Sequence, residues 1–93
     1  MSDETVTVTV EIQNKLGLHI RPSRSFSSLA KSWDAVVSVR NQDRTAYADS
    51  QLDLLMLAAC QGTKLEISAS GPQAREAVDS LVKLVNERFG ESE

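Results

Sequence analysis

The chain has few of the residues that build disulfide, metal and redox sites. It contains one cysteine, Cys60, and no C-x-x-C pair, which excludes an internal disulfide and argues against a zinc or thiol-redox site. No apolar run approaches the length that spans a membrane, and the start Met-Ser-Asp-Glu lacks the basic and apolar segments of a signal peptide. We therefore expect a cytoplasmic protein without membrane insertion.

Glycine and proline are also scarce, at four and two in 93 residues, which argues against a disordered or low-complexity chain. The apolar share of 41% and the charged share of 25% are ordinary for a globular protein. A chain of this length is too short for two domains that each have a core. We expect one domain over residues 1–93, with residues 1–4 and 91–93 frayed.

The balance of charge weighs against nucleic-acid binding. The formal net charge is −3, and only 4% of the residues are aromatic, so neither a basic field nor a base-stacking platform is indicated. One stretch differs from this average, because no carboxylate lies between Ile12 and Trp33. That stretch holds the only histidine, His19, and four basic residues, which are Lys15, Arg21, Arg24 and Lys31. We expect a phosphate to be bound there.

The period of the hydrophobic pattern changes along the chain. Alternation predicts strands at residues 5–12, 35–40, 45–48 and 64–70, and helical spacing predicts three helices between them. The helices begin near Pro22, after Ser50 and after Pro72. The order βαββαβα favours an α+β open-faced β-sandwich, in which three helices cover one face of a four-stranded antiparallel sheet.

The second helix carries an S-x-x-D capping signal at Ser50 and Asp53. Its apolar spacing runs through Leu52, Leu55, Met56 and Ala59 until Gly62, and Cys60 is expected near its buried end. The last helix has an apolar stripe and is expected to end at Gly90.

His19 is the candidate for chemistry because it lies at the start of the first predicted helix. A lone histidine is more often structural, but helix starts favour negative charge by roughly 0.3–1 kcal/mol and bind phosphate. Arg21 adds a planar fork of donors, while Gly17 and Pro22 set the loop around the histidine. A neutral imidazole is a nucleophile near pH 7, so it can accept a phosphoryl group and pass it on.

The segment Asn14-Lys15-Leu16-Gly17-Leu18-His19-Ile20-Arg21-Pro22 resembles the active-site signature of HPr, the histidine-containing phosphocarrier of the bacterial phosphotransferase system. The resemblance covers nearly the whole chain. The segment Asp49-Ser50-Gln51-Leu52 lies where the family has its regulatory serine and second helix, and Gln61-Gly62-Thr63 resembles the turn into its last strand.

The resemblance implies that His19 accepts a phosphoryl group from phospho-enzyme I, itself charged by phosphoenolpyruvate. The group then passes to an acceptor protein of the phosphotransferase system. Arg21 would stabilise the phosphoryl group, within an active-site loop that includes Gly17, Ile20 and Pro22. Such a carrier is a substrate of phosphotransferase enzymes rather than an enzyme, works as a monomer, and needs no metal or cofactor.

Several residues near this site depart from the family pattern. Ile20 replaces a small residue, and Gln51 lies where the family usually has an apolar one. These departures motivate the hypothesis of a specialised or regulatory branch with dedicated partners. The residues expected to contact those partners are Ser23, Arg24, Gln51, Leu52 and Leu55.

Two alternatives stay open. Ser50 is either only a helix cap or also the target of an HPr kinase/phosphorylase, whose phosphate beside Asp49 and Asp53 would add like-charge repulsion. The chain is either a carrier or an HPr-like docking module that controls a kinase or a transcription factor. A small enzyme or metal carrier is disfavoured because the sequence lacks a P-loop, a C-x-x-C pair and a second histidine.

Overall fold

The computed structural model describes residues 4–93, and the expectation of a frayed start at residues 1–3 lies outside the described residues. Four antiparallel strands form one sheet in the order β1-β4-β2-β3. The elements are β1 (Glu4–Glu11), α1 (Ile20–Lys31), β2 (Val36–Asn41), β3 (Arg44–Tyr47), α2 (Gln51–Met56), β4 (Lys64–Gly71), α3 (Ala74–Asn86) and the 3-10 turn η1 (Arg88–Gly90). The predicted fold class and the order βαββαβα are confirmed.

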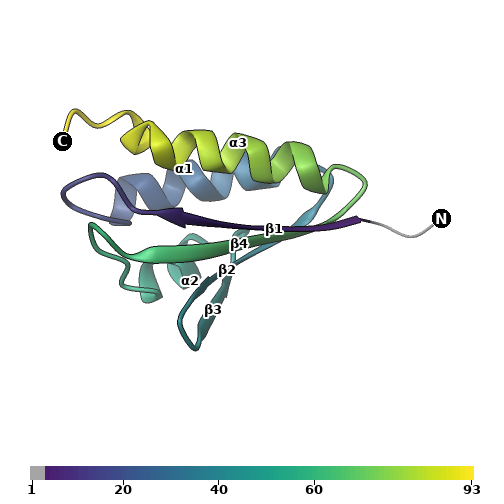
Figure 1. Ribbon diagram of the computed structural model, residues 1–93, viewed down its shortest axis with the longest axis horizontal. Coiled ribbons are helices and arrows are strands. Elements are labelled where there is room, and N and C mark those ends of the chain that lie inside the picture. Colours follow the sequence, from purple (N-terminus) through teal and green to yellow (C-terminus); the bar gives the residue numbers. More distant parts are fainter. Residues whose placement is uncertain (1–3) are drawn as a thin grey trace.

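The sheet forms because alternate residues of its strands are apolar. Strand β4 lies between β1 and β2, and its Ile67 is paired with Val8 on one side and Val39 on the other. Val39 and Ile67 are fully buried, while the intervening serines and threonines face away from the core. Helices α1 and α3 lie together on the apolar side of β1 and β4, and α2 packs against α1 and β3 (Figure 1).

Helix α3 presents the predicted apolar stripe to this core, but it ends earlier than expected. Ala74, Ala77, Val78, Leu81 and Val85 are all buried. The helix stops at Asn86 instead of Gly90, because Arg88 and Phe89 have φ of 57° and 54° and therefore leave the right-handed helix. Phe89 still reaches the core with 8% of its surface exposed, so the turn is held by packing.

Helix α2 is shorter than the sequence predicts, and one of its leucines supplies its contact with the core. The Ser50 side chain caps the helix by accepting the Asp53 N–H, but the reciprocal half of the capping box is missing because Ser50 donates its own N–H to Tyr47. Leu54 is the fully buried residue of the helix. Leu52 and Met56 are 67% and 62% exposed, so the apolar spacing of the helix does not by itself mark its buried side.

The end of α2 also explains why Cys60 is exposed, contrary to expectation. Ala58 adopts a φ of 53°, which turns the chain out of the helix just after Met56. The side chains of Asn41 and Arg44 donate to the carbonyls of Leu57 and Met56 and thereby satisfy this helix end. Cys60 lies beyond that point in a surface turn.

Substitution of Leu54 and Leu52 tests this assignment of the buried face. We expect Leu54→Ala to lower the free energy of unfolding by about 2–5 kcal/mol, because it leaves a cavity in the core. Leu52→Ala should change it by less than about 0.5 kcal/mol, because the side chain is mostly in solvent. Urea denaturation measures both, and a larger effect of Leu52→Ala would contradict the assignment.

Candidate functional site

His19 is the N-cap residue of α1, as the sequence predicts. Its side chain makes no capping hydrogen bond to the helix, so the imidazole is free to serve elsewhere. Ser23 donates its N–H to the His19 carbonyl at 2.9 Å, and Pro22 has no N–H. Among the described residues, the N–H groups of Ile20 and Arg21 have no partner, so the helix presents two donors beside the histidine.

The loop before His19 depends on glycine at position 17. Gly17 has a φ of +71°, and a Cβ there would lie 2.4 Å from the Ala59 carbonyl oxygen. Leu18 donates its N–H to the same oxygen at 2.9 Å. The loop backbone at Gly17 therefore approaches the Ala59 backbone so closely that only glycine fits. This contact fixes the position of the loop that leads into α1.

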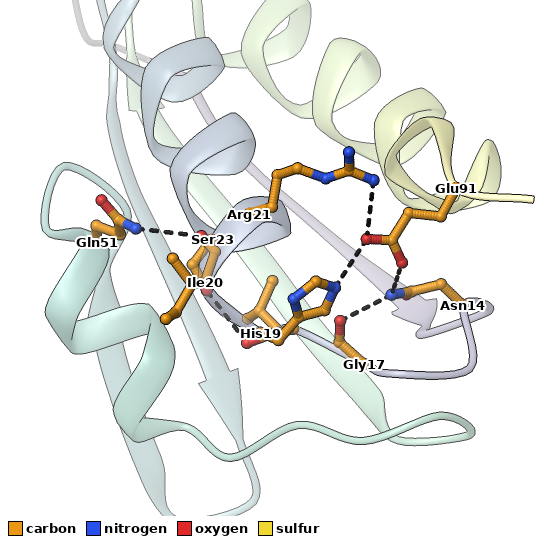
Figure 2. A network of polar contacts seen from close by, with 9 residues as sticks. Asn14, Gly17, His19, Ile20, Arg21, Ser23, Gln51 and Glu91 are labelled. Carbon is orange, nitrogen blue, oxygen red and sulfur yellow. Dashed lines mark hydrogen bonds and ion pairs between the residues drawn. The ribbon is translucent and has the colours of Figure 1, made fainter. Parts of the chain in front are cut away.

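The site also contains a carboxylate that the sequence analysis did not place there. Oε2 of Glu91 lies 2.7 Å from His19 Nε2 and 3.4 Å from Arg21 Nη2 (Figure 2). Oε1 of Glu91 accepts a hydrogen bond of 2.9 Å from Asn14 Nδ2. The Glu91 side chain is only 11% exposed, so the expectation that this residue frays was wrong.

A neighbouring contact holds the rest of the C-terminal segment. Lys15 donates its N–H to the Glu93 carbonyl at 2.7 Å, and its Nζ lies 3.8 Å from Glu93 Oε1. The basic stretch around His19 thus obtains its carboxylates from the end of the chain. The sequence around His19 contains no carboxylate, but the folded protein brings two carboxylates to the site.

The contact with Glu91 determines which tautomer the neutral His19 ring adopts. Burial acts to raise the Glu91 pKa, but hydrogen bonds from Asn14, His19 and Arg21, together with attraction to His19, hold the pKa below its ordinary value. The ionised carboxylate can only accept, so the proton of the short contact belongs to His19 Nε2. In neutral His19 the lone pair is then on Nδ1, the ring nitrogen that points away from Glu91 in Figure 2.

The residues expected to contact partners divide into two groups. Arg24 and Leu52 are exposed, and Leu55 is half-buried, as a contact surface requires. Ser23 is fully buried and donates its hydroxyl to the Leu18 carbonyl, so its assignment to the contact surface was wrong. A polar side chain in the first turn of a helix can bond to its own backbone, and the sequence cannot reveal that choice.

Gln51 has a further role, because its Nε2 donates to the Ile20 carbonyl at 3.1 Å (Figure 2). This bond ties the start of α2 to the residue that follows His19. Beside it, Ile20 is 62% exposed and supplies apolar surface next to the imidazole. The starts of α1 and α2 are therefore directly joined next to His19.

Sequence reasoning missed Asn14 and Glu91. Asn14 was noted only as part of a motif, although a buried amide is the more informative feature. The signal for Glu91 was indirect: four basic residues and a histidine without a nearby acid indicate a carboxylate brought from elsewhere in the chain.

Residues 4–93 contain no helix that is long and apolar enough to cross a membrane. No group of three or more histidine, cysteine, aspartate or glutamate side chains in the same range could hold a metal ion. The fold and the site define a small α+β protein that presents a single histidine at a helix start.

Comparisons with known proteins agree with this class. The sequence model of the family described as "PTS HPr component phosphorylation site" matches residues 6–87. Phosphocarrier protein NPr of Escherichia coli K12 is 44% identical over 88 residues, which are 94% of this chain and 98% of the relative. Phosphocarrier protein HPr of Neisseria meningitidis is 40% identical over 85 residues, which are 91% and 96% of the two chains.

Solved structures extend the likeness to three dimensions. HPr-C-His from Thermoanaerobacter tengcongensis superposes with a TM-score of 0.91 at 34% identity, covering 95% of this chain and 99% of the other. The chain therefore belongs to the HPr family of the phosphotransferase system. It is a phosphoryl carrier that interacts with enzymes of that system.

The titration of Glu91 tests the description of the site. Because its pKa is lower in the folded than in the unfolded chain, this carboxylate stabilises the fold above the pKa of the unfolded chain. That stabilisation is lost as the pH falls through the folded value. Side-chain carbon NMR should show a Glu91 midpoint below that of an ordinary glutamate, and Glu91→Gln should remove this part of the pH dependence. A midpoint at or above the ordinary value would contradict the contacts.

Proposed function

We propose that His19 is the residue that carries the phosphoryl group. In this proposal it accepts the group from phosphorylated enzyme I and delivers it to an acceptor protein of the phosphotransferase system. The observation that carries the proposal is the 2.7 Å contact between His19 Nε2 and Glu91, which leaves the Nδ1 lone pair free beside a helix start.

The transfer step balances without a separate base. The Nδ1 lone pair attacks phosphorus, an N–P bond forms, and the bond between phosphorus and the donor's leaving atom breaks. The proton on Nε2 stays where it is, so the ring becomes positively charged. Glu91 lies against that proton and compensates the charge. Because the protonated ring is a better leaving group, the same contact favours transfer to the next acceptor.

Arg21 and the start of α1 are proposed to stabilise the phosphoryl oxygens. The Arg21 side chain is 69% exposed. Its 3.4 Å contact with Glu91 is longer than the contacts that Glu91 makes with Asn14 and His19. It can therefore turn toward a phosphoryl group at little cost. The unpaired N–H groups of Ile20 and Arg21 supply further donors at the same helix start.

The proposal extends to the finer features of a carrier. The chain works as one domain and as a monomer in the cytoplasm, and it is a substrate of enzymes rather than an enzyme. It needs no cofactor or metal and binds no nucleic acid. Its contact surface with enzyme I and the acceptor is formed around His19 by Ile20, Arg24, Gln51, Leu52 and Leu55, of which Ile20 and Leu52 are more than 60% exposed.

Ser50 is a further candidate for modification, by an HPr kinase/phosphorylase. Its hydroxyl already caps α2, which explains the residue without any kinase. A phosphate on it would lie beside Gln51, whose side chain contacts the Ile20 carbonyl, and would place negative charge on the contact surface. Mass spectrometry of the chain after incubation with ATP and an extract of its own cells tests this modification.

Labelling with phosphate tests the assignment of His19. After incubation with labelled phosphoenolpyruvate and enzyme I, we expect wild type to carry label that is lost in acid and kept in alkali. His19→Ala should carry none, because it lacks the nucleophile. Lys31→Ala, at the exposed far end of α1, is the matched control and should be labelled like wild type.

Label that persists in His19→Ala would overturn the assignment. Absence of label from wild type with its cognate enzyme I would instead favour the docking module that controls a kinase or a transcription factor. Retention of both His19 and Arg21 at the helix start supports the carrier.

A separate experiment tests whether the chain serves a specialised branch. The relatives include proteins named NPr and proteins named HPr, so the family alone leaves the branch open. The bulky Ile20 and the polar Gln51 at the contact surface favour dedicated partners. We expect enzyme I from its own organism to phosphorylate the chain faster than enzyme I from a sugar-transport system. Equal rates would remove this support.

A further inference from the structure

Asn14 is a buried polar residue in the loop after β1 that the transfer chemistry does not use directly. Its side chain is fully buried, which is unusual for an asparagine. The amide nitrogen Nδ2 donates to two acceptors, the Gly17 carbonyl at 2.7 Å and Glu91 Oε1 at 2.9 Å. One amide therefore joins the loop before His19 to the C-terminal segment.

The orientation of this amide is determined by its surroundings. Both groups in contact with Nδ2 are acceptors only, a carbonyl and an ionised carboxylate, so exchanging the amide oxygen and nitrogen would set oxygen against oxygen. The oxygen Oδ1 is buried and has no partner among the described residues. Leaving it unpaired costs free energy, so the two bonds of Nδ2 must outweigh that cost.

The backbone at Glu91 is held by the hydrogen bond from its N–H to the Arg88 carbonyl, at 2.9 Å, so an anchor is needed only for the direction of the side chain. The left-handed residues Arg88 and Phe89 take the chain out of the path of α3, and Phe89 is the last side chain in the core. Beyond Phe89, the Glu91 carboxylate could rotate toward several cations. The bond to Oε1 fixes one oxygen and thereby directs Oε2 to His19 Nε2 (Figure 2).

We infer that Asn14 is a positioning residue for phosphoryl transfer: it holds Glu91 so that Glu91 keeps His19 in the tautomer with the proton on Nε2. This inference rests on the proposed role of His19. Asn14 touches neither the imidazole nor the phosphoryl group, and it acts through the carboxylate alone. The aspartate–histidine pairs of hydrolases use a carboxylate in the same way to orient an imidazole.

The first test combines nitrogen NMR of the His19 ring with the rate of transfer from phosphorylated enzyme I. In Asn14→Asp the donor is lost and a second carboxylate faces Glu91, so the Nδ1–H tautomer should rise and the transfer rate should fall about tenfold. The matched control is Gln13→Glu, the same change at the adjacent exposed residue, whose Nε2 contacts only the Glu11 carbonyl. Its rate should stay within about twofold of wild type.

A double-variant cycle separates positioning from a merely structural role in the loop. Glu91→Ala keeps the bond from Asn14 to Gly17, and it should reproduce the tautomer change of Asn14→Asp. Asn14→Ala combined with Glu91→Ala should be no slower than the slower single variant, because both act through one contact. If Asn14→Asp does not fold, Asn14→Ala repeats the comparison without added charge.

Two results would overturn the inference. One is a folded Asn14 variant with the wild-type tautomer and the wild-type rate. The other is a double variant whose loss is the product of the two single losses, which would mean that Asn14 acts apart from Glu91. Absence of label on wild type would overturn the carrier role of His19 instead, since the ring nitrogens report the tautomer without any phosphoryl donor.

Discussion

The 2.7 Å contact between His19 Nε2 and Glu91 Oε2 is the interaction on which the site depends. It joins residues 72 positions apart, one at the start of α1 and the other just beyond η1. Because the carboxylate can only accept, the contact assigns the proton to Nε2 and the lone pair to Nδ1. In the proposed transfer it also provides a negative charge for the ring that carries the phosphoryl group. The orientation of the His19 ring, the nitrogen that holds its lone pair and the compensation of its charge thus all depend on this one contact.

The rest of the fold maintains this pair. Strand β1 is followed by the loop that contains Asn14 and Gly17. The carbonyl of Ala59 holds this loop by accepting a hydrogen bond from the Leu18 N–H. Phe89 anchors the turn after α3 in the core that the sheet and the helices share. The proposed chemistry needs one imidazole at a helix start and a surface for partners.

The fold could be predicted because the alternation of apolar and polar residues in the strands determines which face of each strand is buried. Valine and threonine alternate along β1, and one face of each strand must be buried. Helix α2 was harder, since apolar residues follow one another from Leu54 to Leu57 and fit more than one helical face. The position of Glu91 was beyond local pattern, because it depends on positive φ at Arg88 and Phe89. Neither residue type favours that conformation, and packing of Phe89 imposes it.

The central claim is that the fold selects Nδ1 of His19 as the nucleophile. The most direct measurement is NMR of the chain enriched in ¹⁵N and phosphorylated through enzyme I. The ring nitrogen that shows one-bond coupling to phosphorus identifies the atom that carries the group. The account predicts coupling to Nδ1 and a proton retained on Nε2. Coupling to Nε2, the nitrogen that contacts Glu91, would contradict it.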